Sequence, residues 1–195
     1  MTDRCVVIIE CKGHRIPDPA RRGGHDSMTS VIEKLIVEPT IQANRFIRFL
    51  REHPGVHRFQ TKKGPINEID TSPVQEYLAV NLTADLIPAP SISWRDLCSA
   101  GFLPSDLEPT PTMSIWEWEI VIELLEGACE KLHYLSRRRD FEKHIRYFGD
   151  EMDLLVCYLE NAFSVGSTFW SGIGSLILHG LSDSNSRPTE KAAQD

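Results

Sequence analysis

The sequence has no long apolar run and no surplus of positive charge. None of its 195 residues belongs to a run approaching the roughly 20 apolar residues that a membrane-spanning helix needs. The formal net charge of −7 argues against a surface that coats DNA broadly, although a local basic groove remains compatible with it. The first residues also lack the layout of a secretory signal peptide. We therefore expect a cytoplasmic protein with no membrane partner.

The cysteines lack the spacing of a metal site or of a redox motif. The five of them, an odd number, lie at positions 5, 11, 98, 129 and 157 and never form a C-x-x-C pair. Three lie within apolar runs, which predicts buried thiols in a reducing compartment. No histidine has a recognisable relation to Cys11, so a Cys–His nucleophilic enzyme is the least supported function class.

The most informative stretch is a predicted strand over residues 6–12, which reads V-V-I-I-E-C-K. Side chains alternate across a strand, so Glu10 and Lys12 share the face of Val6 and Ile8. Because the opposite face is also apolar, we expect this strand in the middle of a covered sheet. A carboxylate and an ammonium at its end are costly to bury unless they are paired or bound to a metal. A simple ion pair at the sheet rim is the competing explanation.

Glu10-Cys11-Lys12, followed by Gly13-His14-Arg15-Ile16-Pro17, resembles the E-x-K half of the motif of the PD-(D/E)XK nuclease superfamily, which has the restriction-endonuclease-like fold. The resemblance implies that Glu10 is a Mg²⁺ ligand and that Lys12 orients or activates the attacking water. Carboxylate oxygens suit Mg²⁺, and a bound metal can supply a hydroxide and stabilise charge on a phosphodiester. The resemblance extends over about a quarter of the chain, from Val6 to about Phe49.

The chain departs from the family because the aspartate that should come first is missing. Only Asp3 precedes Glu10, and it lies on the same extended run, roughly 23 Å away at about 3.3 Å per residue. Either the chain is N-terminally shortened, so that the strand with the aspartate lies upstream of Met1, or its site is incomplete. We expect both, and therefore an inactive nuclease-like chain.

A helix is predicted over residues 31–52, with a break or restart at Pro39. Its core face has helical spacing and consists of Ala43, Phe46, Ile47 and Leu50. Gln42 lies one turn before Phe46, and the superfamily often has a glutamine near the active site on this helix. The resemblance therefore makes Gln42 a third site candidate, although a glutamine at the edge of an apolar face needs no function.

Arginines lie where the phosphate backbone of a nucleic acid would run past such a site. They occur on the Gly- and Pro-rich segment 13–30, which we expect to be a loop, and on the polar side of the helix. A solvated surface is the competing explanation for all of them. The candidates for contact with DNA are Arg15, Arg21, Arg22 and Arg45.

The remaining pattern predicts two further strands and a mainly helical second half. Strands are expected over 56–59 and 74–82, the latter beside the first strand, and residues 110–112 are expected to form a linker. Ser114 and Glu117 form a capping box at the start of a helix, flanked by Met113 and Trp118 at the hydrophobic-staple positions. Two more helices are predicted over 128–144 and from residue 150, with the arginines of 137–139 on the outside and the acidic residues of 150–153 as caps.

The sequence thus predicts an α/β fold with a restriction-endonuclease-like mixed sheet and flanking helices, followed by a mainly α-helical C-terminal region. Its expected parts are a nuclease-like core over 1–93, a helical accessory region over 94–163, and a Gly/Ser-rich and polar, partly disordered tail over 164–195. The leading hypothesis is a metal-dependent nuclease-like protein that is inactive or incomplete, with DNA as a possible partner. The alternative is a non-catalytic protein-binding or scaffold module that retains the fold.

Overall fold

A computed structural model of the chain describes residues 4–60, 62–87, 93–164 and 175–177. Its centre is a three-stranded parallel sheet in the order β1-β4-β5, rather than the mixed sheet predicted. Antiparallel pairing occurs instead in a separate hairpin of β2 and β3, and β6 and β7 form a short parallel pair. The strands are β1 (Cys5–Lys12), β2 (Val56–Gln60), β3 (Ile66–Asp70), β4 (Glu76–Thr83), β5 (Thr112–Ser114), β6 (Arg146–Phe148) and β7 (Ser175–Ile177).

The central strand is β4, and the prediction that the first strand lies in the middle of the sheet was wrong. Every residue of β4 after Glu76 is buried, whereas in β1 only Ile8 is buried and the other residues are half-buried or exposed. Among the described residues β1 has a single strand neighbour, β4, with Ile8 opposite Ala79. The apolar residues on both faces of β1 therefore reflect layers above and below the sheet and not strands on both sides.

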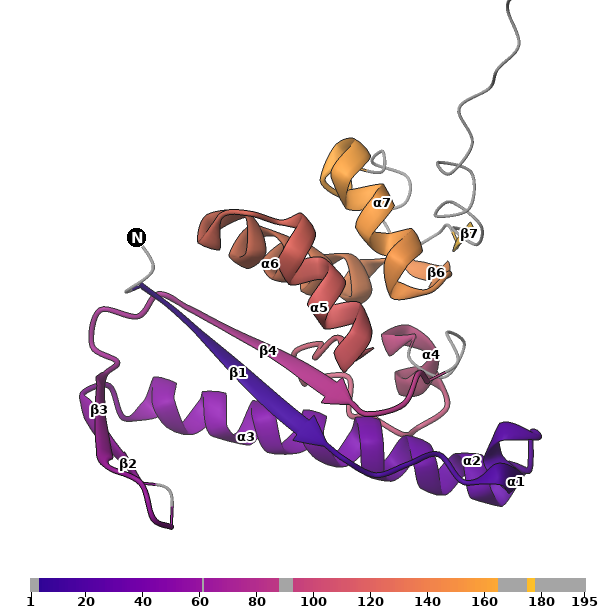
Figure 1. The fold of residues 1–195 in the computed structure, drawn as a ribbon, viewed down its shortest axis with the longest axis horizontal. Coiled ribbons are helices and arrows are strands. Elements are labelled where there is room, and N and C mark those ends of the chain that lie inside the picture. Colours follow the sequence, from indigo (N-terminus) through magenta and orange to yellow (C-terminus); the bar gives the residue numbers. More distant parts are fainter. Residues whose placement is uncertain (1–3, 61, 88–92, 165–174, 178–195) are drawn as a thin grey trace, which may run out of the picture.

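One layer consists of a continuous helical segment that crosses from β1 to β4 (Figure 1). Ala43, Ile47 and Leu50 of this segment pack against Ile8 and Tyr77 of the sheet, which confirms the predicted core face. The segment comprises α2 (His25–Ile32), the π-helical turn η2 (Glu33–Val37) and α3 (Glu38–Glu52), with α1 (Asp18–Arg21) before it.

The prediction that residues 13–30 form an irregular loop was wrong for α1 and most of α2. Tertiary packing stabilises these short helices, because Ala20 and Val31 are buried in a second cluster with Trp94 and Leu97. The latter two residues belong to α4 (Trp94–Ser99).

The other face of the sheet is covered by helices of the second half of the chain (Figure 1). Leu78 of β4 packs with Val121, Leu135 and Phe141 in the largest core cluster, and Val7 of β1 packs against it. The helices are α5 (Ile115–Leu124), α6 (Ala128–His144) and α7 (Glu151–Asn161), which confirms the mainly helical second half. None of the described helices combines the length and the apolar character needed to cross a membrane.

The predicted helix starts are confirmed in atomic detail. The Ser114 side chain accepts a hydrogen bond from the Glu117 amide at 3.2 Å, and Glu117 Oε2 accepts one from the Ser114 amide at 2.7 Å. Asp150 and Asp153 cap α7 in the same reciprocal way. The supposed linker at 110–112 ends in β5, and the expected disorder of the polar tail falls outside the described residues.

The five cysteines are free, and Cys157 alone is fully buried. Cys5 and Cys98 are half-buried and Cys11 and Cys129 are exposed, so of the three buried thiols predicted the structure shows one. Cys11 is exposed because it lies near the end of a strand at the edge of the described sheet.

Candidate functional site

The end of β1 and the first turns of α3 bring two of the three predicted site residues together. Lys12 Nζ donates a hydrogen bond to Gln42 Oε1 over 3.5 Å, although the two residues are 30 positions apart. Glu10 lies two residues before Lys12 on the same strand and therefore on the same face. The side chains of Glu10 and Lys12 are half-buried, and that of Gln42 is exposed. The three residues form a polar, open site at one corner of the sheet.

The position directly across from Glu10 on β4 is occupied by Asn81. This side chain is fully buried, and its Nδ2 donates hydrogen bonds to Thr40 Oγ1 at 3.1 Å and to Thr112 Oγ1 at 3.2 Å. The amide thus joins α3, β4 and β5 beneath the site and adds no charge to it. Our sequence reasoning missed this residue, although an asparagine inside an apolar strand was the available signal.

Asp85, two residues beyond β4, anchors the loop that follows β1. Its Oδ2 accepts hydrogen bonds from the Ile16 amide at 2.8 Å and from Arg21 Nη2 at 2.7 Å. Arg21, predicted to contact a nucleic acid, therefore forms an ion pair within the chain. The other three arginines of that prediction, Arg15, Arg22 and Arg45, are exposed.

The oxygen donors at this corner do not fit a tightly held Mg²⁺. Mg²⁺ prefers octahedral oxygen coordination, with one or two carboxylates plus waters or substrate phosphates. The site offers the carboxylate of Glu10 and the amide oxygen of Gln42, and the latter already accepts a hydrogen bond from an ammonium. Across the described parts of the chain, no group of three or more His, Cys, Asp or Glu residues could hold a metal ion. Asp3, the only acidic residue before Glu10, lies outside the described residues.

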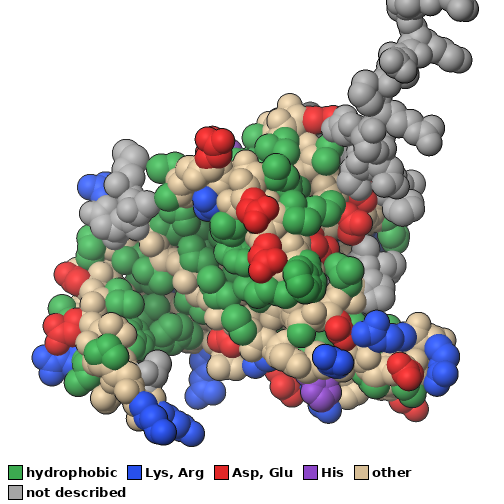
Figure 2. All heavy atoms as spheres, in the orientation of Figure 1, with side chains coloured by type: hydrophobic (Ala, Val, Ile, Leu, Met, Phe, Trp, Pro, Cys, Tyr) green, Lys and Arg blue, Asp and Glu red, His purple; other side chains and the backbone are tan. Residues whose placement is uncertain are grey.

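An apolar cavity of about 350 Å³ lies beside β1 on the side of α3. Five consecutive residues of β1, Val6 to Glu10, line it together with Phe46 and Leu50 of α3 and with Phe59 and Ile69 of the β2–β3 hairpin. Figure 2 shows hydrophobic side chains gathered over this part of the surface. The candidate site therefore adjoins an apolar groove that runs along the strand.

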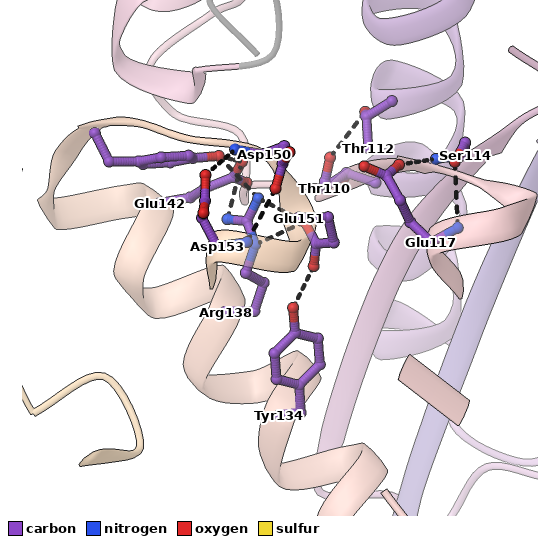
Figure 3. A network of polar contacts seen from close by, with 11 residues as sticks. Thr110, Thr112, Ser114, Glu117, Tyr134, Arg138, Glu142, Asp150, Glu151 and Asp153 are labelled. Atoms are coloured by element: carbon purple, nitrogen blue, oxygen red, sulfur yellow. Dashed lines mark hydrogen bonds and ion pairs between the residues drawn. The ribbon is translucent and has the colours of Figure 1, made fainter. Parts of the chain in front are cut away.

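A second polar cluster lies inside the helical layer and was missed in the sequence (Figure 3). Arg138 was predicted to point outward with its two neighbouring arginines, but its side chain is fully buried. It forms ion pairs with Glu142 at 3.1 Å and with Glu151 at 3.2 Å. The hydroxyl of Tyr134 donates to Glu151, and that of Tyr147 donates to Glu142.

Burial raises the pKa of both Glu142 and Glu151, with Arg138 acting in the opposite direction. Tyr134 and Tyr147 also have a raised pKa, again chiefly because they are buried. All five side chains are at most 2 % exposed, so the cluster is closed to a ligand. It links α6, β6 and α7, and its role is structural.

Comparisons with protein-family models, with curated proteins and with solved structures find no match to this chain.

Proposed function

We propose that the chain is a nuclease-like protein with the restriction-endonuclease-like fold, resembling metal-dependent hydrolases of nucleic acids, and that its site is incomplete. The observation that supports the proposal is the contact between Lys12 and Gln42. It joins the end of the E-x-K strand to the following helix, which is the arrangement that the resemblance implies. The parallel pairing of β1 with β4 through a helical crossover agrees with it.

The incompleteness follows from the chemistry of the donors. A metal-dependent hydrolase needs an ion that is fixed firmly enough to position a water and the phosphate. Glu10 has no second carboxylate opposite it, because Asn81 occupies that position and uses its amide in buried hydrogen bonds. In this proposal the chain does not hydrolyse phosphodiesters by its own residues. A carboxylate supplied from elsewhere would be required to bind Mg²⁺.

A cleavage assay tests this proposal. Plasmid and single-stranded DNA are incubated with Mg²⁺ or Mn²⁺ and with the unmodified chain, Glu10→Ala, or the control Glu52→Ala, which removes an exposed carboxylate at the end of α3. We expect no cleavage above background from any of the three proteins. Metal-dependent cutting by the unmodified chain and by Glu52→Ala that disappears with Glu10→Ala would overturn the proposal.

Contact with DNA is a separate part of the proposal. If DNA runs along the loop after β1, replacing the exposed Arg15, Arg22 and Arg45 by Ala should weaken binding of labelled single-stranded DNA at low salt, measured by fluorescence anisotropy. Replacing Arg21 should chiefly lower stability, since its guanidinium pairs with Asp85. Equal binding by the triple variant and the unmodified chain would exclude this surface.

The apolar groove favours a second candidate function, that of a non-catalytic protein-binding module. Apolar surface beside an open strand edge is typical of sites where another polypeptide docks. The groove lies against β1, and Ile9, one of the residues that line it, is 45 % exposed.

A further inference from the structure

The outer edge of β1 presents unpaired backbone groups. The carbonyl of Arg4 accepts from the Gln75 amide at 2.8 Å, and that of Lys12 accepts from the Ala84 amide at 3.3 Å. In a parallel pair of strands, every second residue hydrogen-bonds through its backbone amide and carbonyl to the same neighbouring strand. The backbone groups of the even-numbered residues of β1 therefore point towards β4. The amides and carbonyls of Cys5, Val7 and Ile9 therefore point to the outer edge. No strand in the described ranges pairs with that edge.

Apolar surface flanks this edge on both faces of the sheet. On the α3 side lies the cavity of about 350 Å³. Ile9, which also lines this cavity, is 45 % exposed, and on the other face of the sheet helix α5 exposes Trp116 by 65 % and Leu124 by 56 %. Figure 2 shows hydrophobic side chains covering much of this face. Open strand edges beside apolar surface promote association with another chain.

We propose that a second copy of this chain occupies the edge, with the two β1 strands antiparallel and Val7 opposite Val7 at a twofold axis. In this register Arg4 lies opposite Glu10 of the second copy, and the reverse pair forms by symmetry. On the same face Val6 lies opposite Ile8, and on the other face Cys5 lies opposite Ile9. Arg4 and Glu10 thus meet opposite charges, and from Cys5 to Ile9 apolar side chains meet apolar side chains or a cysteine.

Other symmetric registers are less complementary. Centring the pair on Ile8 places Arg4 opposite Lys12 and Val6 opposite Glu10. Centring it on Ile9 places Glu10 and Lys12 opposite apolar residues. A twofold axis at Cys11 pairs Glu10 with Lys12, but Val6 and Ile8 then have no strand residue of the second copy opposite them. The distribution of charge along β1 therefore selects the register with Val7 on the axis.

The dimer joins two three-stranded sheets across the β1 edges. The side chains of Val6 and Ile8 of the second copy lie on the face of the sheet that holds the apolar cavity, which Phe46 and Leu50 also line. Arg4 of the second copy lies beside Glu10, so that the carboxylate neutralises a guanidinium. The inference rests on the edge alone and does not depend on the proposed nuclease-like origin. It also assigns Glu10 a role that needs no metal.

Charge reversal tests the register in the full chain. Sedimentation equilibrium over a wide concentration series should give twice the chain mass of 22.1 kDa. Arg4→Glu and Glu10→Arg should each raise the dissociation constant about tenfold, because each creates two like-charge pairs per dimer. The double variant should restore it to within about threefold, since all pairs are again opposite. Arg22→Glu, an exposed reversal near α1, is the control and should have no effect.

A cross-link tests the axis independently. Residues directly opposite in a hydrogen-bonded antiparallel pair have Cα atoms about 5.5 Å apart, which a disulfide spans. Under mild oxidation Val7→Cys should form a covalent dimer through position 7, identified by mass spectrometry. Ile41→Cys, on α3 and 43 % exposed, should not. A chain that stays monomeric at all concentrations would overturn the inference. So would a dimer that is insensitive to both charge reversals and forms no cross-link at position 7.

Discussion

Arg138 on α6 and Glu151 in the first turn of α7 form an ion pair that has essentially no contact with solvent. Their side chains are 0 % and 1 % exposed, and Arg138 Nη2 lies 3.2 Å from Glu151 Oε2. Glu142, one turn after Arg138, shares the same guanidinium. One cation thus serves two buried carboxylates, while the Tyr134 hydroxyl donates to Glu151 Oε1 and the Tyr147 hydroxyl donates to Glu142 Oε1 (Figure 3). Arg138 therefore links α6 to α7 by its buried ion pair with Glu151, in addition to the apolar packing of residues such as Leu135 and Leu154.

Arg138→Met should lower the free energy of unfolding by about 3–5 kcal/mol, because it leaves two buried carboxylates without a cation. Urea unfolding followed by circular dichroism measures the change. Arg48→Met, which removes an exposed arginine from α3, is the control and should change the stability by less than about 0.5 kcal/mol. A loss below about 1 kcal/mol for Arg138→Met would show that the cluster does not hold the helices together.

The raised pKa of Glu142 makes stability depend on pH with a defined sign. Since burial raises its pKa in the folded state, the folded chain binds this proton more tightly than the unfolded chain. The resulting stabilisation is complete below the ordinary value of about 4.3 and is lost as the pH rises through the raised value. Glu151, which shares Arg138, follows the same direction.

Glu142→Gln removes one of these titrations while leaving an oxygen for the Tyr147 hydroxyl. We expect the variant to lose less stability than the unmodified chain between about pH 5 and pH 8. Urea unfolding at several pH values gives the two curves, with the exposed Glu52→Gln as control. The prediction would be contradicted if the free energy of unfolding changed with pH by the same amount in Glu142→Gln and in the unmodified chain.

Local signals in the sequence located the helices of the second half well. The capping boxes at Ser114 and Asp150 are formed by residues three positions apart, so they are visible in the sequence and are present in the structure. The helix over 128–144 was predicted with the bounds it has. The resemblance implied that Gln42 lies near the site, and the Gln42 side chain is within hydrogen-bond distance of Lys12, but its role at the site stays a prediction.

The sequence-based predictions that were wrong concern contacts between segments that are far apart in the chain. The sequence does not distinguish the three consecutive arginines 137–139. Arg138 differs because it forms a buried ion pair with Glu151 of the next helix. Apolar residues on both faces of β1 indicate that other elements cover both faces of the sheet. They do not indicate whether strands pair with one edge of β1 or with both. The groove was also missed, because one of its walls includes β3, whose residues are all exposed and largely polar.

Ser114→Ala should destabilise the chain by about 1–2 kcal/mol, at the upper end for loss of an N-cap. The side chain caps the start of α5 and is only 1 % exposed, so no water can readily replace it on the Glu117 amide. Chemical denaturation measures the loss. Ser105→Ala, at an exposed position, should have little effect. Equal stability of the two variants would mean that the cap contributes nothing measurable.

Asn81→Asp should create the carboxylate pair that the site lacks. Asp at this position lies directly across from Glu10 on the neighbouring parallel strand, about 4.8 Å away at the backbone. Without metal, the variant should lose about 1–3 kcal/mol, because a buried charge replaces a hydrogen-bonded amide. Mg²⁺ or Mn²⁺ should then raise its melting temperature, since an ion bound between two carboxylates stabilises the folded state.

This prediction is tested by measuring the melting temperatures of the unmodified chain, Glu10→Ala, Asn81→Asp and the double variant, each with and without Mg²⁺ or Mn²⁺. The unmodified chain and Glu10→Ala should show no specific response to either ion, because in the described structure Asn81 and not a second carboxylate lies across from position 10. Asn81→Asp should respond, and adding Glu10→Ala to it should abolish the response. If the double variant responds as strongly as Asn81→Asp alone, the ion binds elsewhere and Glu10 does not face position 81. A response by the unmodified chain that depends on Glu10 would show instead that its site already holds a metal.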